Sequence, residues 1–389
     1  MGYVEYTPYR QRVTFEQDFN PIPKTSVDGW KKIPVIESTE SHEKLIPIGP
    51  FSPYFSDCDM SAVYFGERGE GESINFVGHP VDRNVSLLTH YVREDVLNKL
   101  GIAQSVLPTG CYFRLYDTYR PLEMQQALFD AQYEKLRHEH PDWSKEKLEV
   151  QTQTYVSLPS PDPTHGTIHP SPHSTGGVVD LTIIRLSDEG QQLLHDLNFR
   201  ELEGKLNYPI SKAEKTDYDS VVSWIHTEAT KKGWTKTYCD IVLKNWMPQY
   251  RYFKEKAEIF HVHSQELDMG TSFDHFGLEA GMRYFEELSH QRELDEKEGA
   301  ILHNRRFLYR IMTEAGFANY PEEWWHWSYG DNMWAANKQK SYAIYSTVVM
   351  NEDDKTFEWA RKGVYTDALS RIGKPVLFAS FIEKDSRKV

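Results

Sequence analysis

The spacing of apolar residues predicts a helix, a strand and a second helix in succession. From Glu94 onward, apolar side chains at 96, 97, 100 and 102 recur at helical spacing, and residues 112–116 then alternate like a strand. The next helix is predicted from Leu122 to about Arg137, with Pro121 at its first position, where the missing N–H has no cost. Arg120 is therefore expected at a strand-to-helix junction.

A polar loop and a buried strand are predicted next. Residues 157–177 are rich in Pro, Ser, Thr and Gly, which is typical of a loop, whereas residues 178–184 are rich in β-branched residues. The loop contains His173 and the strand contains Asp180. We therefore expect the loop to bring His173 to the mouth of that strand.

The second half of the chain predicts one long helix and one short strand. The helix runs from about Glu298 to Ala315, buries an apolar stripe that includes Leu308, and ends before Gly316. The strand is the aromatic segment Glu323–Trp327. Between them and the first half, residues 187–266 are mixed and aromatic-rich, with helical spacing around 218–232, and predict an insertion or subdomain.

Composition narrows the classes of protein that fit. The 389 residues are 39% hydrophobic, and no run reaches the ~20 apolar residues that cross a bilayer. Acidic residues outnumber basic ones by 58 to 44, giving a net charge of −14, so neither nucleic acid nor a membrane is an expected partner. The three cysteines are far apart, and the N-terminus lacks the pattern of a secretory signal, so we expect a soluble cytoplasmic protein.

Four residues have the chemistry of a catalytic zinc site. Such a site needs three nitrogen or oxygen ligands, a position for water and a nearby base. His173, Asp180 and His326 can provide the ligands, and Glu323 the base. Glu323 and His326 are three residues apart, so either a bulge or a strand end brings them to one side, or the Glu323 side chain reaches round the strand.

For each residue alone, a structural role is the alternative. A buried histidine beside tryptophans can bond a backbone carbonyl in the core, and Arg120 can form an ordinary salt bridge.

Six groups of residues occur in the same order as in one known family. They are Asn75-Phe76-x-Gly78-x-Pro80-Val81-Asp82; Tyr119-Arg120-Pro121; Ser171-x-His173-x-x-Gly176-x-x-x-Asp180-Leu181-Thr182; Met269-Gly270-x-x-Phe273-Asp274; Asn304-Arg305-Arg306 with Met312 and Gly316-Phe317; and Glu323-Trp324-Trp325-His326. Through them the chain resembles the D-alanyl-D-alanine dipeptidases of the vancomycin-resistance type, among the zinc D,D-peptidases related to the hedgehog signalling domain.

The resemblance implies a role for each matched residue. It places one Zn²⁺ per chain on His173, Asp180 and His326, the general base at Glu323, and an arginine that steadies the oxyanion at Arg120. It also implies that Ser171 and Asp274 surround the free amino terminus of the substrate. From the residues alone, Asp274 could equally cap a turn, and Ser171 could hydrogen-bond the loop backbone.

The implied activity is hydrolysis of a small dipeptide, D-Ala-D-Ala or a related D-amino-acid dipeptide, by metal-activated water. The alternatives are a related zinc D,D-carboxypeptidase, an amidase acting on another small amide, and a non-catalytic zinc-binding protein. An oligomer is compatible with the sequence but not evident in it.

The resemblance also implies an α+β fold with a small, mainly antiparallel central sheet flanked by helices. We expect an extended arm over residues 1–50, a zinc peptidase domain over 51–335 with the insertion at about 187–266, and a C-terminal extension over 336–389.

Overall fold

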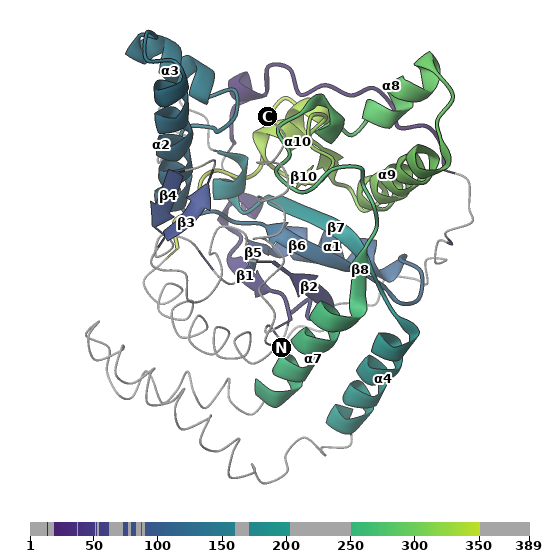
Figure 1. The fold of residues 1–389 in the computed structure, drawn as a ribbon. Coiled ribbons are helices and arrows are strands. Elements are labelled where there is room, and N and C mark those ends of the chain that lie inside the picture. The colour runs from purple at the N-terminus through teal and green to yellow at the C-terminus, as the bar shows by residue number, and fades with distance from the viewer. Residues whose placement is uncertain are drawn as a thin grey trace, which may run out of the picture.

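Figure 1 shows the computed structural model, in which a sheet at the centre is surrounded by helices. The structure describes residues 14, 19–36, 38–50, 52, 54–61, 73–76, 79–82, 87, 90–159, 171–202 and 250–350. The helix predicted around 218–232 lies outside these residues.

The central sheet has six strands and is mainly antiparallel, which confirms the predicted α+β fold. Its order is β2-β6-β7-β10-β9, with β8 also paired to β7, and only β2 and β6 run parallel. Two antiparallel two-stranded sheets, β1 with β5 and β3 with β4, lie outside it. The strands are β1 (Leu45–Ile48), β2 (Cys58–Met60), β3 (Ser73–Phe76), β4 (His79–Asp82), β5 (His90–Arg93), β6 (Cys111–Asp117), β7 (Val178–Leu186), β8 (Ser264–Glu266), β9 (Ala318–Asn319) and β10 (His326–Ser328).

The three long helices predicted from apolar spacing are confirmed. They were predicted to begin at Glu94, Leu122 and Glu298, and each observed start lies within two residues of the predicted one. They are α1 (Glu94–Ser105), α2 (Leu122–Glu139), α3 (Lys145–Thr152), α4 (Asp188–Leu202), α7 (Tyr250–His263), α8 (Tyr284–Gln291), α9 (Glu296–Glu314) and α10 (Asn332–Asn337). Short 3-10 turns complete the set: η1 (Trp30–Lys32), η2 (Glu40–His42), η6 (Pro172–Thr175) and η9 (Leu278–Ala280). No helix in the described ranges combines the length and apolar character needed to span a bilayer.

The ends of α2 and α9 show how local sequence sets them. Pro121 was predicted to be the first residue of α2, but its ψ of 151° is extended and not helical. It is therefore the N-cap, and the helix begins one residue later, at Leu122. The other prediction, that α9 stops at Gly316, is confirmed. Gly316 has a φ of 104°, and the N–H of Phe317 donates to the carbonyl of Met312 at 3.1 Å, which satisfies a carbonyl at the helix end.

β7 has a different environment on each of its faces. Val179, Leu181 and Ile183 join the main hydrophobic core, which includes residues of α1 and α9. The alternate residues Ile184 and Leu186 pack with side chains of α4 and α7. Because side chains alternate along a strand, Asp180 points to this second face, at the end of β7 that α4 and α7 do not cover.

The outer parts of the chain are also packed onto this central unit. β1, within the predicted arm, pairs with β5, and Val35 bridges to Ala343 beyond the predicted end of the main domain. The side-chain amide of Asn332 in α10 donates to the carbonyl of Ile33 at 2.6 Å. β8, within the predicted insertion, is a strand of the central sheet.

Candidate metal centre and active site

A row of polar side chains crosses the middle of the sheet. Asp180 on β7 lies directly opposite Asp117 on β6 and His326 on β10. Residues directly opposite one another point to the same face, so the three side chains gather there. The row lies on the face of the central strands and is not confined to an edge of the sheet.

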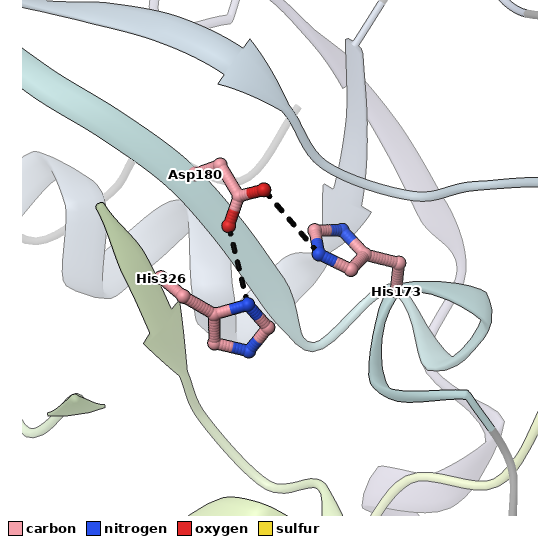
Figure 2. A group of neighbouring side chains, drawn as sticks. All are labelled: His173, Asp180 and His326. Carbon is pink, nitrogen blue, oxygen red and sulfur yellow. Dashed lines mark ion pairs between the residues drawn. The ribbon is translucent and has the colours of Figure 1, made fainter. Parts of the chain in front are cut away.

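η6 adds His173 to this row. After it, Gly176 takes a left-handed φ of 72°, and Gly177 lies so close to the carbonyl of Tyr329 that a Cβ atom would be 2.5 Å from that oxygen. The chain can therefore turn from η6 directly into β7. As Figure 2 shows, His173 and His326 both direct a ring nitrogen at the carboxylate of Asp180.

The three side chains lie close enough to share one ion. His173 Nε2 is 3.4 Å from Asp180 Oδ2, and His326 Nδ1 is 3.3 Å from Asp180 Oδ1. One ligand atom from each residue lies within 4.8 Å of the others, and all three residues are buried. Two imidazoles and one carboxylate are a ligand set that zinc accepts.

Hydrogen bonds behind the two rings decide which nitrogen of each is available. His173 Nδ1 lies 2.8 Å from the carbonyl of Thr118, which can only accept, so Nδ1 bears the proton and Nε2 carries the lone pair. Ser328 donates to Asp331 at 3.0 Å, and its oxygen lies 3.4 Å from His326 Nε2. That arrangement leaves Nδ1 of His326 as the lone-pair nitrogen, and fixing a ligand histidine in this way is typical of metal sites.

The charges of the centre also fit a bound cation. Asp180 Oδ1 is buried and accepts no hydrogen bond within the described structure. Burial raises the pKa of Asp180 well above its ordinary value, and neighbouring Asp117 raises it further. Burial also holds the pKa of both histidines below the ordinary value, with Arg120 contributing at His173. The neutral imidazoles keep a lone pair for a metal, and a cation at this point would favour the charged form of Asp180, which burial alone disfavours.

Glu323 reaches the centre from a turn. β10 begins only at His326, so the predicted strand over Glu323–Trp327 is wrong in its first three residues. The N–H of His326 donates to the carbonyl of Glu323 at 3.4 Å, and this turn brings Glu323 Oε2 to 3.5 Å from His326 Nδ1. Strict alternation along a strand would put Glu323 and His326 on opposite faces, and the turn before the start of β10 brings them to the same side.

Glu323 combines burial with access to solvent. Burial raises the pKa of its carboxylate, which suits a group that must take up a proton near neutral pH, and His326 partly opposes this rise. Its side chain keeps 35% exposure. The carboxylate can therefore meet a water molecule or a substrate.

Arg120 lies beside the centre, held by a residue that sequence reasoning missed. Its Nε and Nη2 donate to Asp117 Oδ2 at 3.0 and 2.6 Å, and the same oxygen lies 3.2 Å from His173 Nδ1. Asp117 therefore links the arginine to a candidate ligand. The sequence feature that could have identified Asp117 is its position, directly after the predicted strand and three residues before Arg120. Asp331 and Gln125 were also missed, and nothing in the local sequence marks them.

Ser171 and Asp274 line a cavity whose wall also includes His173, Asp180 and His326. Ser171 donates to Gln125 Oε1 at 3.0 Å, and Gln125 also accepts from Arg120 Nη1 at 2.9 Å. Asp274 has a φ of 56°, a left-handed conformation in which aspartate is enriched among non-glycine residues. The structure thus brings all seven predicted residues to one region, and their individual roles stay predictions.

The Asp274 loop, residues 269–281, is anchored by a buried arginine. Arg305 on α9 is fully buried and donates to the carbonyls of Met269, Glu279 and Gly281 at 2.8, 2.7 and 2.5 Å. The N–H of Trp324, next to Glu323, donates to the carbonyl of Ala280 at 2.9 Å. The loop is therefore fixed to both α9 and the Glu323 turn.

Arg305→Leu is expected to lower the free energy of unfolding by at least about 3 kcal/mol, because three buried carbonyls lose hydrogen bonds from a charged donor. Arg310→Leu on the same helix removes an exposed pair with Glu314 and should cost less than about 1 kcal/mol. Urea unfolding of both variants measures the difference. Equal losses would contradict the anchoring role.

The centre opens into a large cavity. Its volume is about 860 Å³, and its wall includes His173, Asp180 and His326 together with Glu323 and Arg120. Trp30 of η1, from the predicted arm, contributes to the wall as well. The cavity therefore brings together the candidate metal site, a base and a segment from the far N-terminal part of the chain.

Comparisons with known proteins agree with the resemblance. Residues 259–345 match a family model described as D-ala-D-ala dipeptidase. A D-alanyl-D-alanine dipeptidase from Synechocystis sp. is 36% identical over 72 residues, which cover 18% of this chain and 29% of the relative. The chain thus matches less than a third of the length of that relative. The family match contains Asp274, Glu323 and His326, whereas His173 and Asp180 precede it.

Proposed function

We propose that this chain, whose residues 259–345 resemble the D-alanyl-D-alanine dipeptidases, is a zinc metallopeptidase that cleaves dipeptides, with D-Ala-D-Ala or a related D-amino-acid dipeptide as substrate. The observation that carries the proposal is the convergence of His173, Asp180 and His326 on one point, with the Glu323 carboxylate 3.5 Å from His326 Nδ1. A purely structural zinc site would have no use for a partly exposed carboxylate beside it.

Zinc would be held by His173 Nε2, a carboxylate oxygen of Asp180 and His326 Nδ1, and when bound it would lower the pKa of water and polarise the scissile carbonyl. Glu323 takes the proton of the attacking water, since its carboxylate lies beside the ligand nitrogen and faces the cavity. Glu323 then passes this proton to the leaving nitrogen, and two free amino acids are released.

Arg120 stabilises the negative oxygen that forms on the substrate carbonyl. A guanidinium stays charged throughout the reaction, so it does not compete for the proton that Glu323 moves. Asp117 keeps the guanidinium in place with two hydrogen bonds, at 3.0 and 2.6 Å. The same carboxylate contacts His173, so one residue aligns the arginine with a ligand.

Asp274 and Ser171 bind the free amino terminus of the dipeptide. A carboxylate opposite an ammonium group supplies a charge-assisted hydrogen bond, and a substrate with a blocked amino terminus would lose it. This pairing predicts a preference for free dipeptides over longer or N-acylated chains.

The proposal is tested by incubating the zinc-quantified protein with D-Ala-D-Ala, L-Ala-L-Ala and N-acetyl-D-Ala-D-Ala and measuring the amino acids released, with a chelator control. We expect chelator-sensitive cleavage of the free D,D-dipeptide alone. Cleavage of the N-acetyl compound would instead indicate a carboxypeptidase. Stoichiometric zinc without cleavage of any of the three would overturn the proposed substrate and leave a zinc-binding protein or an amidase for another small amide.

A further inference from the structure

The cavity is larger than a dipeptide of two alanines needs. Its volume of about 860 Å³ lies in the upper part of the range of ~300–1,000 Å³ that is usual for drug-sized ligands. The three candidate metal ligands occupy one place in its wall, since one ligand atom from each lies within 4.8 Å of the others. The remaining volume is therefore available for a substrate side chain.

Three large apolar side chains in the cavity wall are exposed to solvent. Tyr155 is 48% exposed, Phe276 is 55% and Leu278 is 86%. The rings of Tyr155 and Phe276 meet edge to face, with centroids 6.0 Å apart, although they come from segments more than a hundred residues apart. A group of exposed apolar side chains around a cavity is typical of a surface that binds an apolar group.

Two of the three apolar residues belong to the loop that carries the proposed amino-terminus site. Phe276 follows Asp274 by two residues, and Leu278 begins η9 in the same loop. Arg305 binds the carbonyls of that loop on both sides of Asp274. The loop backbone that carries Asp274, Phe276 and Leu278 is therefore held in place at both ends.

The chemistry of a dipeptide connects the two features. The first residue bears its ammonium group and its side chain on the same carbon atom. When Asp274 binds the ammonium group, the side chain of the first substrate residue therefore begins close to the Asp274 loop. A methyl group would leave most of the apolar wall in water, whereas an aromatic side chain would cover it.

We propose that Tyr155, Phe276 and Leu278 form a specificity subsite for a bulky apolar side chain on the amino-terminal residue, so that the preferred substrate is a free dipeptide beginning with an aromatic residue. This inference rests on the proposed function, because it takes Asp274 as the partner of the substrate amino group. It adds the kind of side chain preferred on the amino-terminal residue of that dipeptide, which the family resemblance does not supply.

The test compares D-Phe-D-Ala with D-Ala-D-Ala on the zinc-loaded full chain. We expect kcat/KM to be at least about tenfold higher for D-Phe-D-Ala, which is the size of effect that a few methylene groups produce in an apolar pocket. Phe276→Ala should bring the ratio of the two values towards one. Val150→Ala is the matched control, because Val150 is 66% exposed on α3 and outside the cavity, and it should leave the ratio unchanged.

A binding measurement separates this inference from the proposed function. Non-hydrolysed phosphinate analogues of the two dipeptides are titrated into the same proteins by calorimetry. Tighter binding of the phenylalanine analogue, lost in Phe276→Ala, supports the subsite even if neither dipeptide is cleaved. Cleavage of D-Ala-D-Ala at least as fast as D-Phe-D-Ala would overturn the subsite and leave the peptidase proposal standing. Equal binding of the two analogues would overturn it as well.

Discussion

Glu323→Gln is expected to reduce kcat by about a thousandfold while zinc content stays at one ion per chain. Glutamine has the same shape and keeps the turn before β10, but its amide cannot take the proton from water, and general-base catalysis contributes roughly 10²–10⁴ in rate. Glu323 is outside the proposed set of three ligands, so we expect metal binding to be unaffected. Stopped assays of amino-acid release, with zinc measured in the same sample, provide both quantities.

Glu322→Gln is the matched control for this substitution. It makes the same chemical change one residue earlier, where the carboxylate accepts a hydrogen bond from Tyr320 at 2.8 Å. Most of the turnover should remain in that variant. Unimpaired turnover in Glu323→Gln would remove Glu323 from the mechanism, whereas loss of zinc in it would show that Glu323 is a ligand.

His326→Ala is expected to abolish both zinc binding and activity. Substitution of a group that merely orients a metal ligand already costs roughly 10–100-fold in metal affinity, and removal of a ligand should cost more. The substitution leaves Asp180 buried with one histidine in place of two. We expect less than about a tenth of an ion per chain after dialysis against metal-free buffer, in contrast to one ion in the unsubstituted protein.

Thermal unfolding provides a second readout for His326→Ala. A ligand that binds only the folded state raises its stability, so added zinc should raise the Tm of the unsubstituted protein and leave that of the variant unchanged. His290→Ala, at an exposed position on α8, is the control and should respond to zinc like the unsubstituted protein. Full zinc occupancy in His326→Ala would contradict the ligand assignment.

The sequence by itself determined the elements that hold the site. Apolar spacing is a local property, and it located α1, α2 and α9 because each of these helices buries one stripe of its own residues. A run rich in β-branched residues located the start of β7, which is buried on both faces. Gly316 ended α9 for the equally local reason that it can take a left-handed φ. The candidate residues were recognisable from side-chain chemistry and from their order along the chain.

Only the tertiary structure decided how those residues meet. The register of β6, β7 and β10 places Asp180 opposite both Asp117 and His326. Local sequence does not determine this register, because the strands that pair are more than sixty residues apart in the chain. The contact between His173 Nδ1 and the carbonyl of Thr118 likewise joins residues 55 positions apart.

The boundary of β10 and the shape of the cavity were likewise decided by contacts at a distance. Three aromatic residues follow Glu323 and suggested a strand there, but the turn bonded to Ala280 and Tyr320 delays β10 until His326. Trp30 and Tyr155 line the cavity because distant segments pack around it. Local sequence predicts the secondary structure that a segment prefers. The site, in contrast, is formed by side chains from different elements, and only the folded chain brings these elements together.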